Sequence, residues 1–220
     1  MISKIAASVM CANLGQLEND IKELEANGVE YIHIDIMDGD FVPNFTFGTD
    51  FCDAIRKMTD VPLDIHLMIQ RPELHIEKFK PLPNEFICVH QEATVHLQRT
   101  LALIKSFGAR PAVALNPATS ISTIEDVLED VEMVLIMTVN PGYAGQKLVP
   151  QTIEKIGRMR KFLDDRGFTG TSIEVDGNVN FENAKKMRGA GADIFVAGSS
   201  SIFIKELGLA KGVEELRKCI

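Results

Sequence analysis

Histidine and aspartate alternate with isoleucine at two places in the chain. His33 and Asp35 are separated by one isoleucine, and Asp64 and His66 are spaced in the same way. Side chains two residues apart lie on one face of a β-strand, so each pair projects together if the segment is extended. A histidine beside a carboxylate can bind a divalent metal ion or exchange protons with a substrate.

A third segment carries two carboxylates, because Glu174 and Asp176 are also in phase. Each of these polar residues alone is more simply explained as a hydrogen-bonded core group. Several carboxylates at one buried site would be costly unless a cation or hydrogen-bond donors met them. A candidate metal shell is therefore formed by His33, Asp35, His66 and Asp176. Nitrogen and oxygen ligands without thiolate suit zinc, manganese, iron(II), cobalt or magnesium, and the sequence does not choose among them.

The segments that carry these residues belong to a regular alternation along the chain. Eight short apolar runs, rich in β-branched residues, alternate with longer segments of helical periodicity. The predicted strands are 5–10, 31–37, 62–68, 85–90, 111–115, 133–139, 172–176 and 193–197. The predicted helices include 15–27, 94–107, 150–166 and 180–189.

Several predicted helices stop at a glycine just before the next strand, as at Gly28, Gly108, Gly167 and Gly191. Glycine suits a left-handed helix cap. Strands joined by crossover helices are parallel, and eight such units predict one closed (β/α)8 barrel, a TIM barrel, spanning residues 1–220. An open doubly wound sheet is the alternative, but its Gly-rich dinucleotide fingerprint is absent. Barrel active sites lie at the carboxyl ends of the strands.

Composition limits the classes of function. The chain has 23 basic and 31 acidic side chains and a formal net charge of −8, which disfavours a nucleic-acid or acidic-membrane partner. No segment is long and apolar enough for a signal peptide or a membrane span, and the four cysteines lack the paired spacing of zinc sites. The sequence predicts a cytoplasmic protein with reduced thiols. A homo-oligomer is compatible with it, since many barrels self-associate.

A glycine-rich loop at 140–146 follows the sixth predicted strand, and its glycines allow backbone N–H groups to approach an anion closely. An ordinary turn explains such glycines about as well. Two further loops, at 177–178 and 198–199, follow the seventh and eighth strands, where phosphate is often held in this fold. Because Lys147 is the only basic residue in these turns, backbone donors and helix N-termini would hold the phosphate.

Four methionines, Met10, Met37, Met68 and Met137, lie near the ends of predicted strands. Core packing is the commonest role of methionine. Here the four side chains could also form a dry floor, which would strengthen the electrostatic effect of a metal ion and carboxylates on a reacting carbon.

With these motifs the chain resembles the ribulose-phosphate 3-epimerase family, which includes the D-allulose-6-phosphate 3-epimerases. The resemblance covers nearly the whole chain and implies a (β/α)8 barrel of the ribulose-phosphate-binding type. It rests on Ala7-Ser-Val-Met-Cys11, His33-Ile-Asp-Ile-Met-Asp-Gly-Asp-Phe-Val-Pro-Asn44, Asp64-Ile-His-Leu-Met68, Leu115-Asn-Pro-Ala-Thr119, Met137-Thr-Val-Asn-Pro-Gly142, Ile173-Glu-Val-Asp-Gly177 and Phe195-Val-Ala-Gly-Ser199.

The resemblance implies a phosphorylated ketose as substrate, no organic cofactor, and one divalent metal ion held by His33, Asp35, His66 and Asp176. The two aspartates would also act as acid and base. Inversion of C3 through an enediolate removes a proton from one face and delivers one to the other, which requires two opposed groups. The implied substrate-binding residues are Ser8, Met37, His66, Met68, Met137, Gly142, Tyr143, Ala144, Gly145, Gln146, Gly177, Asn178, Gly198 and Ser199.

Two departures from the family pattern bear on the identity of the sugar. Ala144 and Asn178 each occupy a position where ribulose-phosphate 3-epimerases usually carry one glycine of an adjacent pair. These residues and the Met10-Cys11 pair narrowly favour conversion of D-allulose 6-phosphate to D-fructose 6-phosphate. The stretch 90–100 instead resembles the branch that converts D-ribulose 5-phosphate to D-xylulose 5-phosphate in the pentose phosphate pathway.

Two other functions compete on the same scaffold. A Schiff-base aldolase needs a lysine at a strand end, and a metal-assisted decarboxylase usually has one among its acids, but no predicted strand contains lysine. A sugar-phosphate binder without activity would not need paired carboxylates beside a metal ion. The sequence therefore favours an isomerase.

Overall fold

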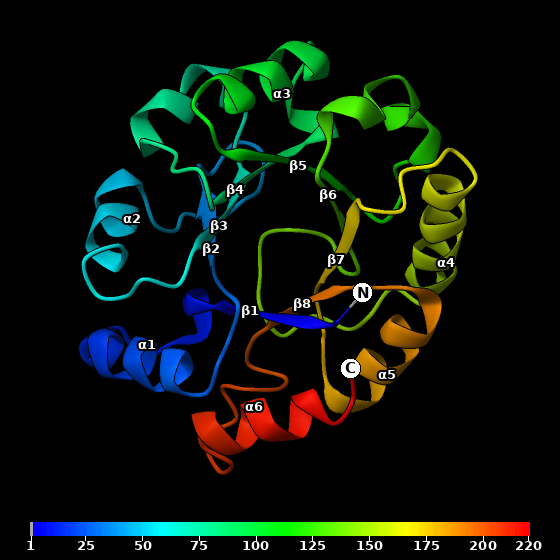
Figure 1. Cartoon of the computed structure of the whole chain (residues 1–220). Helices are drawn as coiled ribbons and strands as arrows, with labels where there is room; N and C mark the ends of the chain where they lie inside the picture. The colour runs from blue at the N-terminus through cyan, green and yellow to red at the C-terminus, as the bar shows by residue number, and fades with distance from the viewer. Residues whose placement is uncertain (1) are drawn as a thin grey trace.

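The computed structural model describes residues 2–220, which contain a closed barrel of eight parallel strands. The strands follow one another around the barrel in chain order, and the last pairs with the first to close it (Figure 1). This confirms the predicted TIM barrel. The strands are β1 Lys4–Ser8, β2 Tyr31–Met37, β3 Leu63–Met68, β4 Phe86–His90, β5 Arg110–Leu115, β6 Met133–Met137, β7 Ser172–Asp176 and β8 Ile194–Ala197.

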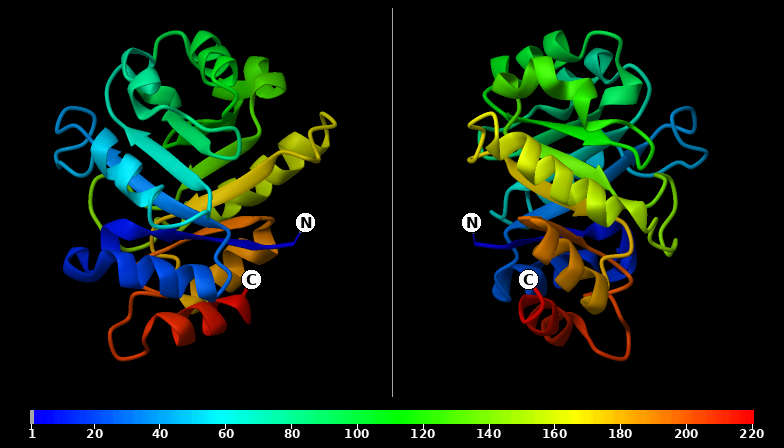
Figure 2. Two further views of the ribbon diagram at one scale, coloured as in Figure 1. Left: turned by 60° about the vertical axis from the view of Figure 1, so that its left-hand side comes forward. Right: turned by 90° about the vertical axis from the view of Figure 1, so that its right-hand side faces the viewer.

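Helices surround the barrel on its outer side (Figures 1 and 2). Within residues 2–220 the α-helices are α1 Leu17–Ala26, α2 Thr49–Ile55, α3 Leu97–Ser106, α4 Gln151–Asp164, α5 Phe181–Ala190 and α6 Leu209–Arg217. Two crossovers lack the expected α-helix. Between β3 and β4 the chain forms short 3₁₀ turns that begin at Pro72, because prolines interrupt this stretch. Between β5 and β6 it forms the 3₁₀ segment Ile121–Asp130.

The bounds of β1 and β6 differ from the predicted 5–10 and 133–139. The apolar run continues past Ser8, but Val9–Cys11 form a 3₁₀ turn closed by the bond from the Ala12 N–H to the Val9 carbonyl, 3.1 Å long. The strand β1 begins at Lys4, whose Nζ lies 3.3 Å from the Tyr31 hydroxyl. This lysine therefore lies at the amino end of the barrel and is not placed to form a Schiff base at the carboxyl end.

The predicted glycine caps are confirmed by positive φ angles of 72°, 82°, 83° and 108° at Gly28, Gly108, Gly167 and Gly191. Each glycine reverses the chain after a helix with no steric penalty, so the following strand can begin.

Alternation along β2 separates an apolar face from a polar one. Ile32, Ile34 and Ile36 are buried in the core between the barrel and its helices. Burial of each isoleucine contributes about 1.5–3 kcal/mol, so the outward direction of these side chains is strongly fixed. His33 and Asp35 must then point into the barrel, because a slip of one residue would exchange the two faces.

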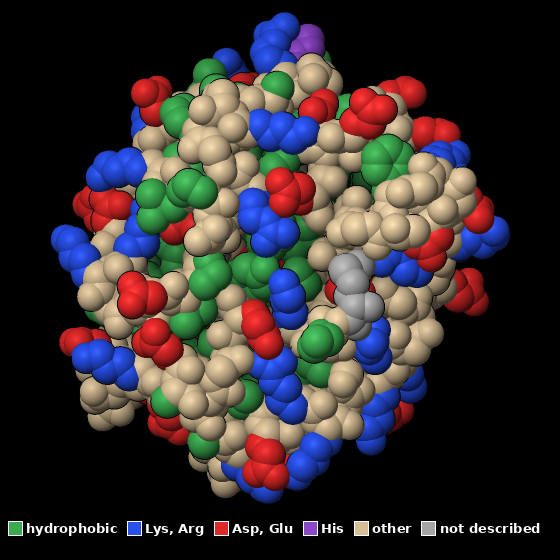
Figure 3. All heavy atoms as spheres, in the orientation of Figure 1, with side chains coloured by type: hydrophobic (Ala, Val, Ile, Leu, Met, Phe, Trp, Pro, Cys, Tyr) green, Lys and Arg blue, Asp and Glu red, His purple; other side chains and the backbone are tan. Residues whose placement is uncertain are grey.

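Acidic and basic side chains are interspersed on the face shown in Figure 3, and no large patch of one charge sign is visible there. No helix within the described part of the chain is long and apolar enough to cross a membrane. All four cysteines are free thiols in the structure.

Candidate active site

The register of β2 against β3 places the polar side chains next to one another. His33 pairs with Asp64, and Asp35 pairs with His66. Asp176 approaches the same place from the end of β7. The structure thus brings together the four predicted metal ligands, whose nitrogen and oxygen atoms all lie within 4.8 Å of one another.

His33 is held between two carboxylates. Its Nδ1 lies 2.5 Å from Oδ2 of Asp64, and its Nε2 lies 3.2 Å from Oδ1 of Asp35. Burial lowers the pKa of His33, but the negative charges of Asp35 and Asp64 outweigh burial and hold this pKa well above its ordinary value. The environment of His33 therefore demands a positive charge, which either a proton or a metal ion can supply.

The two candidate acid–base groups differ in their electrostatic environment. Burial raises the pKa of Asp35, but the opposing effect of His33 and His66 is larger. The pKa of this carboxyl therefore lies below its ordinary range. Burial and the negative charge of Asp35 raise the pKa of Asp176 to about 6. Two carboxyls whose pKa values are pushed apart are typical of an acid–base pair.

The donor set fits a divalent metal ion. Two imidazoles and two carboxylates converge in a buried place where unpaired carboxylates would be costly. Asp64 accepts from Nδ1 of His33, and this leaves Nε2 as the nitrogen that faces the cluster. Such a mixed nitrogen and oxygen site suits the metals that the sequence predicts.

Glu174 lies deeper in the barrel and is fully buried. Neither of its carboxylate oxygens has a hydrogen-bond partner within residues 2–220, and the same holds for Oδ1 of Asp64. Burial and the charge of Asp64 raise the pKa of Glu174 well above its ordinary value. This shift favours the neutral form of Glu174 beside the carboxylate that holds His33.

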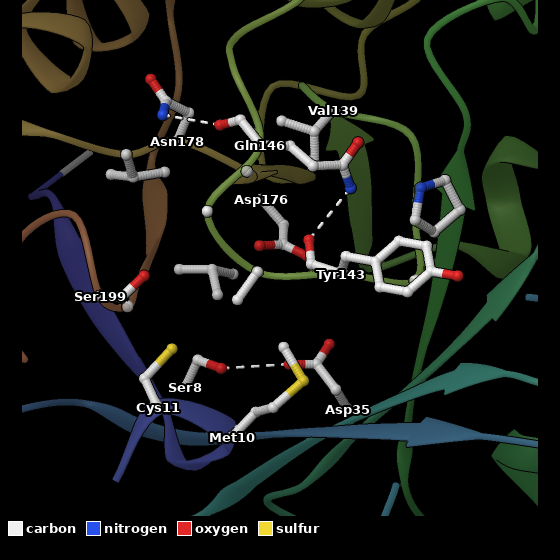
Figure 4. A pocket seen from close by; sticks show the side chains of 18 of the residues that line it. Ser8, Met10, Cys11, Asp35, Val139, Tyr143, Gln146, Asp176, Asn178 and Ser199 are labelled. Carbon is white, nitrogen blue, oxygen red and sulfur yellow. Dashed lines mark hydrogen bonds between the residues drawn. The ribbon is translucent and has the colours of Figure 1, made fainter. Parts of the chain in front are cut away.

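A cavity opens at the carboxyl ends of the strands, and the carboxylates of Asp35 and Asp176 point into it from β2 and β7 (Figure 4). No lysine or arginine is found among the described residues of its wall. Of the predicted substrate-binding residues, those that line the cavity are Ser8, Met37, Met68, Met137, Gly142, Tyr143, Ala144, Gly145, Gln146, Gly177, Asn178, Gly198 and Ser199.

His66 is the exception among these predicted residues. It is fully buried beneath the cavity, where Nδ1 lies 3.2 Å from Oδ1 of Asp35 and Nε2 lies 2.9 Å from Nε2 of His90. Four apolar wall residues carry no signal in the sequence that would mark them, namely Val139, Pro141, Val179 and Val196. Met10 and Cys11, which the sequence singled out for other reasons, and Ser200 also line the wall.

Two loops close over one side of the cavity. The Asn44 side-chain amide donates to the Gly142 carbonyl at 2.8 Å, and the Tyr143 hydroxyl donates to the Pro43 carbonyl at 3.0 Å. These bonds join the loop after β2 to the loop after β6. The sequence does not predict this connection, because the partners are about a hundred residues apart along the chain.

The two departures from the family pattern are compatible with the local backbone. Asn178 has a left-handed φ of 51°, which asparagine adopts more readily than most residues other than glycine. Ala144 is not among the residues with positive φ, so glycine is not required there. Neither position therefore implies a different pocket backbone.

Comparisons with known proteins agree with this geometry. A model of the ribulose-phosphate 3 epimerase family matches residues 4–203. The ribulose-phosphate 3-epimerase of Bacillus subtilis is 45% identical over 197 residues, which cover 90% of this chain and 91% of the relative. The chloroplastic ribulose-5-phosphate-3-epimerase of Arabidopsis thaliana is 43% identical over 217 residues, covering 97% of this chain and 77% of the relative.

Among solved structures, tryptophan synthase of Mycobacterium tuberculosis aligns with a TM-score of 0.70 at 13% identity, covering 100% of this chain and 93% of that one. At this identity the likeness shows the fold alone.

Fold and site together define a (β/α)8-barrel isomerase. The chain belongs to the ribulose-phosphate 3-epimerase family. The relatives just described are named for ribulose phosphate, and the comparisons do not support the preference for allulose phosphate that the sequence narrowly favoured.

Proposed function

We propose that the protein is a metal-dependent ketose-phosphate 3-epimerase that interconverts D-ribulose 5-phosphate and D-xylulose 5-phosphate. The observation that carries this proposal is the presence of two carboxylates, Asp35 and Asp176, in one cavity from strands on different sides of the barrel. The names of the relatives support the five-carbon sugar.

In the proposed reaction one aspartate removes the C3 proton, and the other delivers a proton to the opposite face of the resulting enediolate. The reverse reaction exchanges the two roles. The Ser8 hydroxyl donates to Oδ2 of Asp35 at 3.1 Å and so orients that carboxylate. Met37, Met68 and Met137 line the same cavity and would keep water from the reacting carbon.

His33, Asp35, His66 and Asp176 would hold one divalent metal ion. A bound ion would supply positive charge next to the oxygens on which the enediolate charge develops. Zinc, manganese, iron(II), cobalt and magnesium all suit the donor set, and no organic cofactor is required for this chemistry.

The phosphate group would lie against the loops after β6, β7 and β8. Because no basic side chain lines the cavity in the described residues, backbone N–H groups of these loops would bind it. Gly142, Gly145 and Gly177 have positive φ angles of 122°, 78° and 115°. Glycines in such conformations let the backbone approach an anion closely.

The substrate is tested by measuring kcat/KM for D-ribulose 5-phosphate and D-allulose 6-phosphate with one zinc-loaded preparation. We expect a large preference for D-ribulose 5-phosphate. A preference for D-allulose 6-phosphate would overturn the choice of sugar but leave the epimerase chemistry standing. Absence of C3 proton exchange with either sugar would overturn the function itself. A cytoplasmic location and a homo-oligomeric state stay predictions.

A further inference from the structure

A line of hydrogen bonds leads from the candidate metal cluster, through two buried imidazoles beneath the cavity, to the partly exposed carboxylate of Glu92. Nε2 of His66 lies 2.9 Å from Nε2 of His90, and Nδ1 of His90 lies 3.3 Å from Oε2 of Glu92. Both imidazoles are fully buried, and their ring planes are inclined by 23° with centroids 5.0 Å apart, so the rings meet edge to edge through the two Nε2 atoms. Neither His90 nor Glu92 lines the cavity, so neither is placed to touch a substrate.

The far end of this line is a firmly held carboxylate. Oε1 of Glu92 accepts from the Asn116 N–H at 2.9 Å and from the Thr119 hydroxyl. Burial raises the pKa of Glu92, but hydrogen bonds from His90, Thr119 and Asn116 lower it to about 2. Lys155 reinforces this end, because its Nζ donates to the Asn116 carbonyl at 2.6 Å. Glu92 is therefore ionised and can only accept hydrogen bonds.

This fixed acceptor determines where each imidazole proton lies. Nδ1 of His90 must carry a proton in order to donate to Glu92, and in a neutral ring its Nε2 is then an acceptor. Nε2 of His66 must in turn donate to that acceptor. The remaining nitrogen of His66, Nδ1, then presents a lone pair toward Asp35 and Asp176, at 3.2 Å and 3.9 Å from their oxygens.

We propose that Glu92 and His90 are positioning residues that keep the His66 proton on Nε2, so that Nδ1 is free to bind the metal ion. The proposal rests on the proposed metal site. It gives a role to His90 and Glu92, which begin the stretch 90–100 that resembles the ribulose-phosphate branch of the family. Asp64 acts on His33 in the same way but directly, whereas Glu92 acts on His66 through a second imidazole.

The relay formed by Glu92 and His90 opposes the tautomer of His66 that the metal cluster alone would favour. A carboxylate 3.2 Å from Nδ1 of His66 attracts a proton to that nitrogen, where it would block a metal ion. An acceptor on the other side of the ring holds the proton on Nε2 instead. Loss of an outer partner of a metal-binding histidine typically weakens metal affinity by about 10- to 100-fold.

The first test uses the wild-type protein without metal, labelled with ¹⁵N-histidine, at mildly alkaline pH. Long-range ¹H–¹⁵N correlations identify the protonated nitrogen of each ring, and an N–H···N bond gives a coupling between the two nitrogens that it joins. We expect a proton on Nε2 of His66, a proton on Nδ1 of His90 and a coupling between the two Nε2 atoms. A proton on Nδ1 of His66 would overturn the proposal.

The second test compares zinc affinity, measured by chelator competition, in Glu92→Ala and Glu85→Ala. Glu85 is a control carboxylate that also flanks β4, but it lies at the other end of the strand, is buried and pairs with Arg56 at 2.7 Å. We expect Glu92→Ala to bind zinc at least about tenfold more weakly than the control. Equal affinities in the two variants would contradict the relay.

The two tests separate the relay from the function on which it rests. If the wild-type protein binds no zinc, the proposed metal site fails, and the spectra still decide the tautomer of His66. If zinc binds but the proton lies on Nδ1 of His66 in the metal-free protein, the relay alone fails.

Discussion

The side-chain amide of Asn178 donates to the main-chain carbonyl of Gln146 at 2.8 Å and joins the loop after β7 to the loop after β6 (Figure 4). Oδ1 of Asn178 accepts from the Asn183 amide at 2.7 Å. One residue in a left-handed conformation thus organises two loops of the proposed phosphate site without adding a charge.

We expect Asn178→Gly to raise KM for the phosphorylated sugar by about 2- to 12-fold, the equivalent of one hydrogen bond of about 0.5–1.5 kcal/mol, with a smaller effect on kcat. Asn178→Ala should lose a further 1–2 kcal/mol of folding stability, roughly, because alanine resists the left-handed conformation. Steady-state kinetics and urea unfolding measure both effects. A large fall in kcat at unchanged KM would place Asn178 in the chemistry instead.

Asp35→Asn and Asp176→Asn should each reduce exchange of the C3 proton with solvent by about 10²- to 10⁴-fold, because each removes one of two opposed proton carriers. Exchange is followed by NMR in deuterated water, and zinc content is measured in the same samples. Asp53→Asn is a control at a carboxylate that pairs with Lys80 away from the cavity. Normal exchange in either active-site variant with zinc bound would exclude a two-base mechanism.

Removal of metal should abolish epimerase activity and lower the free energy of unfolding. A ligand that binds only the folded state stabilises it by about 2.7 kcal/mol at a concentration 100 times its Kd. Activity and urea unfolding are measured after chelation and after addition of each divalent ion in turn. Full activity in protein shown to contain no metal would contradict the proposed role of the ion.

The pH dependence of stability should contain a contribution from Lys155. Burial lowers the pKa of Lys155 from 10.5 to about 8. Between these values the unfolded chain holds a proton that the folded protein has released, so raising the pH through this window stabilises the folded state. We expect wild type to gain stability relative to Lys155→Met as the pH rises from about 8 to about 10.5. The exposed Lys161→Met on the same helix is the control, and identical curves for wild type and Lys155→Met would refute the assignment.

Gly177→Ala should destabilise the protein much more than Gly145→Ala. A Cβ atom at Gly177 would lie 2.6 Å from Cγ2 and 2.9 Å from the main-chain nitrogen of Val139, whereas one at Gly145 would meet nothing within 4 Å. Gly145→Ala should cost only the local backbone strain, about 1–2 kcal/mol. Urea unfolding of the two variants measures the difference. Equal losses of unfolding free energy would show that the loop after β7 can move away from Val139 at little cost.

The sequence predicts the barrel and much of its site because both depend on local periodicity. His33 and Asp35 share a face through the two-residue repeat of a strand, and the outward isoleucines of β2 fix which face that is. The position of Asp176 near these residues follows from the rule that the carboxyl ends of all the strands meet at one rim of the barrel. These inferences need no knowledge of which strands are neighbours.

The remaining features depend on long-range register or on turns. The contact between His66 and His90 requires β4 to lie beside β3 with His66 opposite Cys88. Strand β1 ends early at Ser8 because a 3₁₀ turn, rather than a change in hydrophobicity, stops it. The substrate preference inferred in part from Asn178 is not supported by the comparisons, and the left-handed backbone at this position is one that asparagine adopts more readily than most residues other than glycine.

The four residues of the proposed metal site are spaced unevenly along the chain. His33, Asp35 and His66 all precede β4, whereas Asp176 comes at the end of β7. A ribosome therefore releases three ligands long before the fourth, and an unfinished chain also lacks one of the two proton carriers. Firm retention of an ion at the proposed site would begin only when nearly the whole barrel has been synthesised, so bound metal would mark a completed molecule.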